Sequence, residues 1–223
     1  VVPEGAASGM TVTEDRGFAT VLAVRGDYAD AIAVADRISS MSGYVPEGGA
    51  RNIARRDGMG TVMLDGAVSI GRLPDHYFQA VGSGTGGIAA WEASMRLIGD
   101  GRYGERLPRL ELAQNEPFVP MAKAWNAGRR EITAEDLGDE KDVFEVYADV
   151  LTNRKPPYSM AGGVYDAMAA TGGRFHTVTN AEARSAEKLW NSMESSAPNP
   201  AASVALASLI KAVEEGSVDT GSC

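Results

Sequence analysis

A glycine-rich loop between an apolar stretch and a helical pattern constrains this chain more than any other feature. Residues 76–81 read as a buried strand, residues 82–87 have the sequence GSGTGG, and residues 88–98 have the apolar spacing of a helix. A strand that leads through glycines into a helix leaves backbone N–H groups pointing outward, and glycine lets an anion approach them. The pattern therefore predicts a phosphate site, with a structural tight turn as the alternative. The candidate residues are Gly82, Ser83, Gly84, Thr85, Gly86 and Gly87.

Three classes of phosphate site use such a loop. A nucleotide P-loop ends in Gly-Lys-Ser/Thr, which this loop lacks. The dinucleotide fingerprint G-x-G-x-x-G is met by Gly82, Gly84 and Gly87, and Glu111 follows at the end of the next expected strand, about where a ribose ligand is found. Two strand–helix units precede the loop, however, whereas a dinucleotide domain usually begins near it. Pyridoxal phosphate, also held by a glycine loop before a helix, is the third class.

The rest of the chain alternates strand and helix patterns, which predicts an α/β fold with a parallel sheet covered on both faces. Strands are expected at 18–26, 76–81, 108–114 and 174–179. Helices are expected at 28–38 behind an Asp27 cap, at 61–71, at 88–98, from Pro117, at 144–151, at 181–193 behind an Asn180 cap with Leu189 and Trp190 as apolar anchors, and from Pro200 behind an Asn199 cap.

Composition excludes several classes of protein. The net charge of −9 argues against a nucleic-acid surface, which needs a basic stripe. Neither an apolar run long enough to span a bilayer nor a signal peptide is visible, so no membrane partner is expected. Cys223 is the only cysteine, which fits a cytoplasmic location. His76 and His176 are the only histidines and have no cysteine partners, so no metal site is expected.

The order of motifs is similar to that of fold-type-II pyridoxal-phosphate enzymes of the threonine synthase group. RNIARRDGMGTVMLD (51–65) stands where those enzymes have an Arg-Leu-Glu-Gly helix entry, and GSGTGG stands at their phosphate cup. LPRLELAQNEPFVPMAKAW (107–125) follows in order, and MESSAPNPAASVALASLIKAV (193–213) resembles their Glu-Pro-Ala-Ser-Ala helix. Within this group the chain most resembles archaeal cysteate synthases. The resemblance implies a two-domain α/β fold like that of the tryptophan synthase β subunit, with pyridoxal 5'-phosphate as cofactor.

The resemblance also implies a reaction. Sulfite would replace the phosphate of O-phosphoserine at the β-carbon and give L-cysteate, an early step toward coenzyme M in some methanogens. Residues 82–87 would hold the phosphate of the cofactor. Three alternatives stay open: threonine synthase acting on O-phosphohomoserine, an NAD-binding Rossmann domain, and a phosphate- or effector-binding module that is not an enzyme. The sequence does not reveal the oligomeric state, although enzymes of this group are often homodimers.

Several residues are candidates for contact with the substrates. Arg51, Arg55 and Arg56 lie on an expected crossover, where a guanidinium can bind the substrate phosphate or sulfite, or pair with surface carboxylates instead. Gln114 and Asn115 leave a strand beside the glycine loop, where open parallel sheets bind ligands. The alternative for this pair is a plain turn. Residues 159–163 either line the ring pocket or begin a helix.

No lysine of the chain stands in the family context of the lysine that anchors the cofactor. In the enzymes that the chain resembles, this lysine precedes the strand with which the present sequence starts. We therefore expect a longer protein with an upstream lysine, no catalytic residue within this chain, and no activity of the chain alone. Residues 1–43 would be the remainder of a small N-terminal domain, and residues 44–223 most of a larger, phosphate-binding domain. The five lysines are Lys123, Lys141, Lys155, Lys188 and Lys211.

Overall fold

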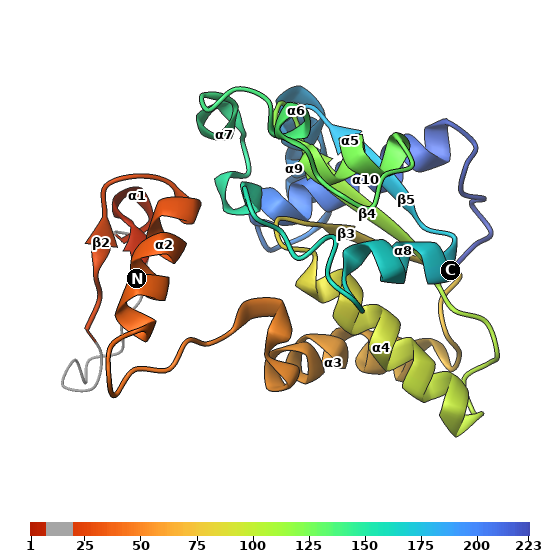
Figure 1. Cartoon of the computed structure of the whole chain (residues 1–223). Coiled ribbons are helices and arrows are strands. Elements are labelled where there is room, and N and C mark those ends of the chain that lie inside the picture. The colour runs from red at the N-terminus through yellow and green to blue at the C-terminus, as the bar shows by residue number, and fades with distance from the viewer. Residues whose placement is uncertain (8–19) are drawn as a thin grey trace. The chain divides into compact units, whose positions relative to one another are not determined.

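The computed structural model describes residues 1–7 and 20–223, which form two compact units (Figure 1). One unit comprises Val1–Gly48 with Asn153–Lys155, and the other comprises Gly49–Thr152 with Pro156–Cys223. The strand expected at 18–26 begins on Phe18 and Ala19, which lie outside the described residues.

The smaller unit pairs two short parallel strands, β1 (Val2–Pro3) and β2 (Ala23–Val24). Helix α1 (Glu4–Ala7) follows β1, and α2 (Tyr28–Ser39) follows β2. The cap expected at the start of α2 is confirmed. Asp27 Oδ1 accepts from Asp30 N at 3.0 Å, and Asp30 Oδ2 accepts from Asp27 N at 2.9 Å. This reciprocal arrangement satisfies two backbone donors that the first turn leaves without partners.

The larger unit is built on a parallel sheet in the order β3-β4-β5, which confirms the α/β prediction. The strands are β3 (His76–Ala80), β4 (Arg109–Asn115) and β5 (Arg174–Val178). Ala80 is in register with Ala113, and Asn115 with Val178, so the three strands end at one edge of the sheet. In open parallel sheets this carboxyl edge is where ligands bind.

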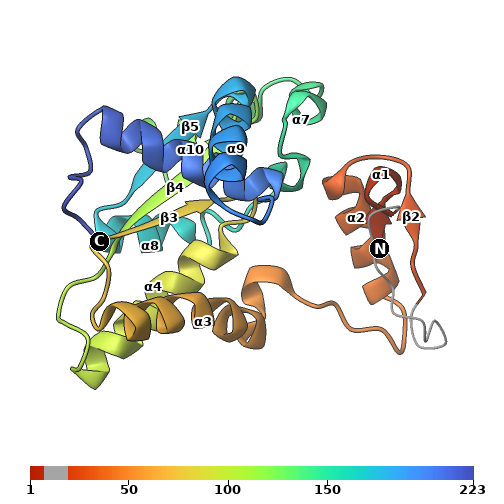
Figure 2. The same cartoon turned by 180° about the vertical axis from the view of Figure 1, so that it is seen from behind.

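Helices cover both faces of this sheet, as Figures 1 and 2 show from opposite sides. One face carries α3 (Ile53–Ile70), α4 (Thr85–Asp100) and α8 (Val164–Thr171), and the other carries α9 (Asn180–Met193) and α10 (Pro200–Glu214). Strand residues alternate accordingly: Leu110 and Leu112 belong to the first core, whereas Ala113 and Val178 belong to the second. The shorter elements are η2 (Gly49–Arg51), α5 (Pro120–Asn126), α6 (Ala134–Leu137), α7 (Asp142–Glu145) and η3 (Asp149–Leu151).

The start of α10 is as predicted, but the start of α9 is not. Asn199 Oδ1 accepts from Ala202 N at 2.8 Å, with Pro200 in the first turn. Helix α9 is capped by Thr179, whose Oγ1 accepts from Glu182 N at 3.2 Å, and not by the expected Asn180. The side chain of Asn180 is used in tertiary hydrogen bonds instead, which sequence spacing does not reveal.

Three further sequence predictions were wrong. Helix α5 begins at Pro120, not at Pro117, because the intervening residues form a packed turn in which Phe118 is buried. The expected apolar anchor Leu189 is 44% exposed in this chain, and the small side chains of α9 are the ones buried. Residues 144–151 do not form a helix but two single turns separated by the extended Val146.

In the part of the chain that the structure describes, none of the helices combines the length and the apolar character needed to cross a membrane.

Candidate functional site

The glycine loop joins β3 to α4 at the carboxyl edge of the sheet. Gly84 occupies the N-cap of α4 with φ 75°, a left-handed conformation that glycine adopts without strain. The first intrahelical bond runs from Ile88 N to Gly84 O at 3.1 Å. The N–H groups of the preceding three residues therefore have no acceptor within the helix. That of Thr85 donates to Ser83 Oγ at 3.3 Å, and the two hydroxyl oxygens lie 2.9 Å apart.

Other parts of the larger unit press directly on the first two glycines of the loop. A β-carbon added to Gly82 would lie 3.0 Å from both the Cα and the carbonyl oxygen of Leu151. A β-carbon on Gly84 would overlap Cγ2 of Val164, the first residue of α8. The loop is therefore walled by two segments that are distant in sequence, and its backbone has no room for side chains on those sides.

The last two glycines are enclosed by the sheet itself. A β-carbon on Gly86 would overlap the side-chain amide of Gln79, which lies in β3. A β-carbon on Gly87 would lie 3.1 Å from Cδ2 of Leu112 in β4. This close contact brings the N-terminus of α4 down onto the carboxyl edge of the sheet. Backbone N–H groups, two hydroxyls and the positive end of a helix dipole meet here, and this donor set fits a phosphate dianion.

Gln114 lies at the carboxyl end of β4, beside the strand that leads into the glycine loop. Its side chain is buried, and its Oε1 accepts from Ala122 N at 3.0 Å. The amide thereby fixes α5 against the sheet. This engagement favours an internal role over contact with a substrate.

Asn115 is 1% exposed, and its side chain is also turned into the protein. Nδ2 donates to Val178 O at 2.9 Å and to Asn180 Oδ1 at 3.0 Å. Oδ1 accepts from Ala148 N at 3.0 Å. The residue joins β4 to β5 and to the segment before Leu151, so the structure gives it far more contacts than a plain turn requires.

The three candidate arginines lie at the start of α3 and just before it. Arg51 ends η2, whereas Arg55 and Arg56 belong to the first turns of α3, so the expectation that all three lie on an irregular crossover was wrong. The sequence did not indicate this start, which the Oδ1 of Asn52 caps by accepting from Arg55 N at 3.2 Å. Arg56 is held by Glu92 of α4, with Nε and Oε2 3.2 Å apart.

Glu111 does not occupy the position that a ribose ligand requires. It lies within β4 rather than at its end, is 1% exposed, and is contacted by both histidines of the chain. His176 Nε2 lies 2.8 Å from one carboxylate oxygen and His76 Nδ1 lies 3.1 Å from the other. Burial raises the pKa of Glu111, but the hydrogen bonds from the two imidazoles outweigh it and lower the pKa overall. The group is a buried charge network of the sheet and is not available to a dinucleotide.

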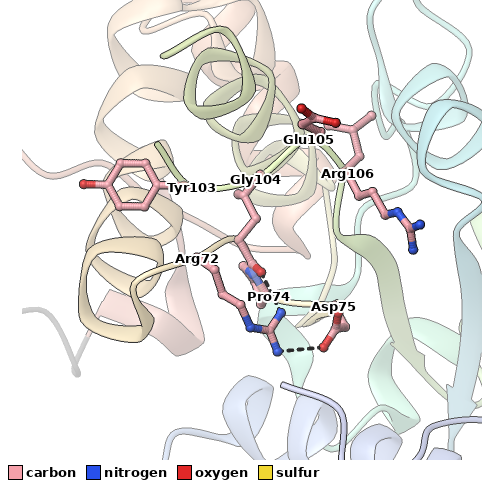
Figure 3. A pocket seen from close by; sticks show the side chains of 9 residues that line it. Arg72, Pro74, Asp75, Tyr103, Gly104, Glu105 and Arg106 are labelled. Carbon is pink, nitrogen blue, oxygen red and sulfur yellow. Dashed lines mark hydrogen bonds and ion pairs between the residues drawn. The ribbon is translucent and has the colours of Figure 1, made fainter. Parts of the chain in front are cut away.

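An open cavity of about 530 Å³ lies at the opposite, amino edge of the sheet (Figure 3). Arg72 and Asp75 form an ion pair there, with Nη2 and Oδ2 3.0 Å apart. This cavity precedes β3 and β4, whereas the glycine loop follows β3, so it is separate from the candidate site. Its lining residues are Arg72, Leu73, Pro74, Asp75, Tyr103, Gly104, Glu105, Arg106 and Leu107.

The wall residues Leu151 and Val164 were not identified from the sequence as part of the loop's surroundings. The stretch 159–163 had been expected either to line the ring pocket or to begin a helix, and Gly163 is the N-cap of α8. That places Val164, the next residue, against Gly84. Only the fold reveals these contacts, because both partners lie more than sixty residues from the loop along the chain.

Curated relatives cover nearly the whole of this chain. It is 58% identical to the cysteate synthase of Methanocorpusculum labreanum over 99% of its own length and 54% of that protein. It is 58% identical to the cysteate synthase of Methanoculleus marisnigri and 57% identical to that of Methanosarcina barkeri, covering 97% and 98% of this chain and 51% and 54% of those proteins. The chain therefore spans about half the length of the curated relatives that it matches.

Solved structures share the fold at low sequence identity. Maize serine racemase superposes with a TM-score of 0.63 at 16% identity, over 90% of this chain and 61% of that one. A bacterial threonine deaminase gives a TM-score of 0.59 at 18% identity, over 88% of this chain and 61% of that one. The family model described as "Pyridoxal-phosphate dependent enzyme" matches residues 1–222. Glycine loop, parallel sheet and family model agree, and the chain belongs to the pyridoxal-phosphate dependent enzymes.

Proposed function

We propose that the protein containing this chain is a cysteate synthase that replaces the phosphate of O-phosphoserine by sulfite. The observation that carries the proposal is the 58% identity to a cysteate synthase over 99% of the chain. Threonine synthase chemistry on O-phosphohomoserine is the alternative within the family. The burial of Glu111 inside β4 argues against the dinucleotide alternative.

In this proposal the glycine loop, residues 82–87, binds the phosphate of the cofactor. Pyridoxal phosphate, when bound, supplies a ring that stores the electrons released when the Cα proton of an amino acid leaves. The chain's own part is to orient this ring by its phosphate, through the free N–H groups of the first turn of α4 and the hydroxyls of Ser83 and Thr85. The absence of acidic residues from that turn keeps the site favourable for an anion.

We further propose that Arg51 or Arg55 binds the anionic group of the substrate or sulfite. Both lie at the N-terminal end of α3, and Arg56 beside them is already paired with Glu92. An alanine substitution of the binding arginine should raise KM for O-phosphoserine or for sulfite by about 10-fold or more, as expected for a lost charge-assisted bond. Arg102→Ala is the matched control, since Arg102 pairs with Asp100 at the far end of α4.

The lysine that anchors the cofactor is proposed to lie outside these 223 residues. Lys211, for example, has its Nζ 3.3 Å from Thr177 O and 3.5 Å from Glu182 Oε1, which fits a structural role. Borohydride reduction of the loaded full-length protein, followed by peptide mapping, tests this placement. A label on any of the five lysines of this chain would refute it, and so would turnover by the isolated chain.

The activity test measures phosphate release from O-phosphoserine by the full-length, cofactor-loaded protein, with and without sulfite, and analyses the products for cysteate. Formation of cysteate that depends on sulfite supports the proposal. Phosphate release from O-phosphohomoserine alone would instead indicate threonine synthase chemistry. A homodimer, a cytoplasmic location and a domain boundary near residue 44 belong to the same proposal. Sedimentation of the loaded protein tests the homodimer.

A further inference from the structure

The segment that covers the glycine loop is held by side chains where a helix would otherwise form. Residues 144–151 have helical apolar spacing, yet Tyr147 N donates to Asn180 Oδ1 at 2.9 Å and Ala148 N donates to Asn115 Oδ1 at 3.0 Å. Asn180 Nδ2 also donates to Glu145 O at 2.7 Å. Two side-chain amides thus take hydrogen bonds that the backbone of a helix would make within itself.

The two asparagines are joined to each other and to the sheet. Asn115 Nδ2 donates to Asn180 Oδ1 at 3.0 Å and to Val178 O at 2.9 Å. Val178 O can only accept and Ala148 N can only donate, which fixes the orientation of the Asn115 amide. Asn115 lies at the end of β4 and Asn180 at the start of α9, so the pair is anchored on two rigid elements.

The held segment ends on the glycine loop. Leu151 N donates to Ala148 O at 2.9 Å, so the position of Ala148 sets that of the turn containing Leu151. The backbone of Leu151 then lies where a β-carbon on Gly82 would be only 3.0 Å away. Ala148 and Leu151 are buried together with Val178 in one apolar cluster, which transmits the placement through packed atoms.

We infer that Asn115 and Asn180 are positioning residues for the phosphate site, acting by holding residues 145–151 against Gly82. They do not contact the ligand themselves; they keep one wall of the glycine loop in place. The inference rests on the proposed binding of the cofactor phosphate at residues 82–87. It assigns to Asn115 a role different from substrate contact, and to Asn180 a role that its place in the sequence does not indicate.

The experiment titrates the full-length apoprotein with pyridoxal phosphate and follows the quenching of tryptophan fluorescence. Asn180→Ala removes the bonds to Tyr147 N and Glu145 O and should raise Kd by about 10-fold, since each lost bond is worth about 1 kcal/mol. Asn180→Asp keeps both acceptor contacts of Oδ1 and should stay within about 3-fold of the wild type. Asn199→Ala, which removes a hydrogen bond of similar strength from the cap of α10, should leave Kd unchanged.

Hydrogen exchange on the same proteins reports the segment directly, with or without ligand. The amides of Tyr147 and Ala148 should exchange about 10-fold faster in Asn180→Ala than in Asn199→Ala. If the alanine variant does not fold, Asn180→Ser carries the same expectation, because its side chain is too short to reach Glu145 O.

Three results decide the matter. A raised Kd together with faster exchange in the alanine variant, and near-normal values in the aspartate variant, support the inference. An unchanged Kd despite faster exchange overturns it while leaving the phosphate site intact. A wild-type protein that shows no saturable binding of pyridoxal phosphate overturns the proposed site itself, and the inference with it.

Discussion

Substituting Gly84 by alanine tests the geometry of the loop, because two separate penalties apply at this position. The residue has φ 75°, which costs a non-glycine residue about 1–2 kcal/mol. Its new β-carbon would also overlap Cγ2 of Val164, and overpacking of this kind costs about 1–3 kcal/mol. The free energy of unfolding should therefore fall by about 2–5 kcal/mol.

Gly101 provides a matched control at the other end of the same helix. It caps the C-terminus of α4 with φ 81°, and a β-carbon there would meet nothing within 4 Å. Gly101→Ala should cost only the conformational part, about 1–2 kcal/mol. Urea unfolding of both variants, with unchanged m-values, measures the difference.

A double-mutant cycle assigns the excess to Val164. If the overlap causes it, Gly84→Ala should cost about 1–3 kcal/mol less in a Val164→Ala background than in the wild type. Equal costs for Gly84→Ala and Gly101→Ala, within about 0.5 kcal/mol, would refute the contact between the loop and α8. So would full additivity in the cycle.

Three further predictions concern stability. The hydrogen bond from Arg129, against the effect of burial, lowers the pKa of Asp136 to about 2; its stabilisation is present above the unfolded value of 3.8 and should be lost, by roughly 2 kcal/mol, as pH falls from about 4 to 2. Urea unfolding across that range should show the wild type converging on Asp136→Asn, and a constant gap would contradict the assignment. Burial raises the pKa of Glu111, but the hydrogen bonds from both histidines lower it further, so its stabilisation is likewise lost below about pH 4; Glu111→Gln should cost about 1–3 kcal/mol at pH 7 and much less at pH 3.5, whereas an equal cost at both pH values would contradict it. Asn199→Ala should cost about 1 kcal/mol through loss of the α10 cap, as measured by urea unfolding, and a cost near zero would show that Ala202 N gains no net stabilisation from the bond.

Local sequence signals identified the elements that carry their own chemistry. Asp27 and Asn199 cap the helices that they were expected to cap, because a cap needs only a side chain and a backbone donor three residues away. The strand, glycine loop and helix around residues 76–100 were equally visible, since apolar periodicity and glycine's access to positive φ are properties of the local sequence.

The sequence failed where distant groups compete for the same backbone atoms. Residues 144–151 have the spacing of a helix, but the amides of Asn115 and Asn180 bind their N–H groups and hold them extended. Asn180 was expected to cap α9, yet it serves this segment, and Thr179 caps the helix. In each case a tertiary hydrogen bond displaced the local one.

The order of the chemistry along the chain was thus determined by the sequence alone: a phosphate loop after a strand, in an α/β chain with motifs in the order of one enzyme family. The tertiary structure decided what surrounds that loop. Leu151 and Val164 reach Gly82 and Gly84 only because the sheet and its helices bring remote segments together. Such contacts depend on packing in three dimensions, for which a linear pattern of residues holds no local signal.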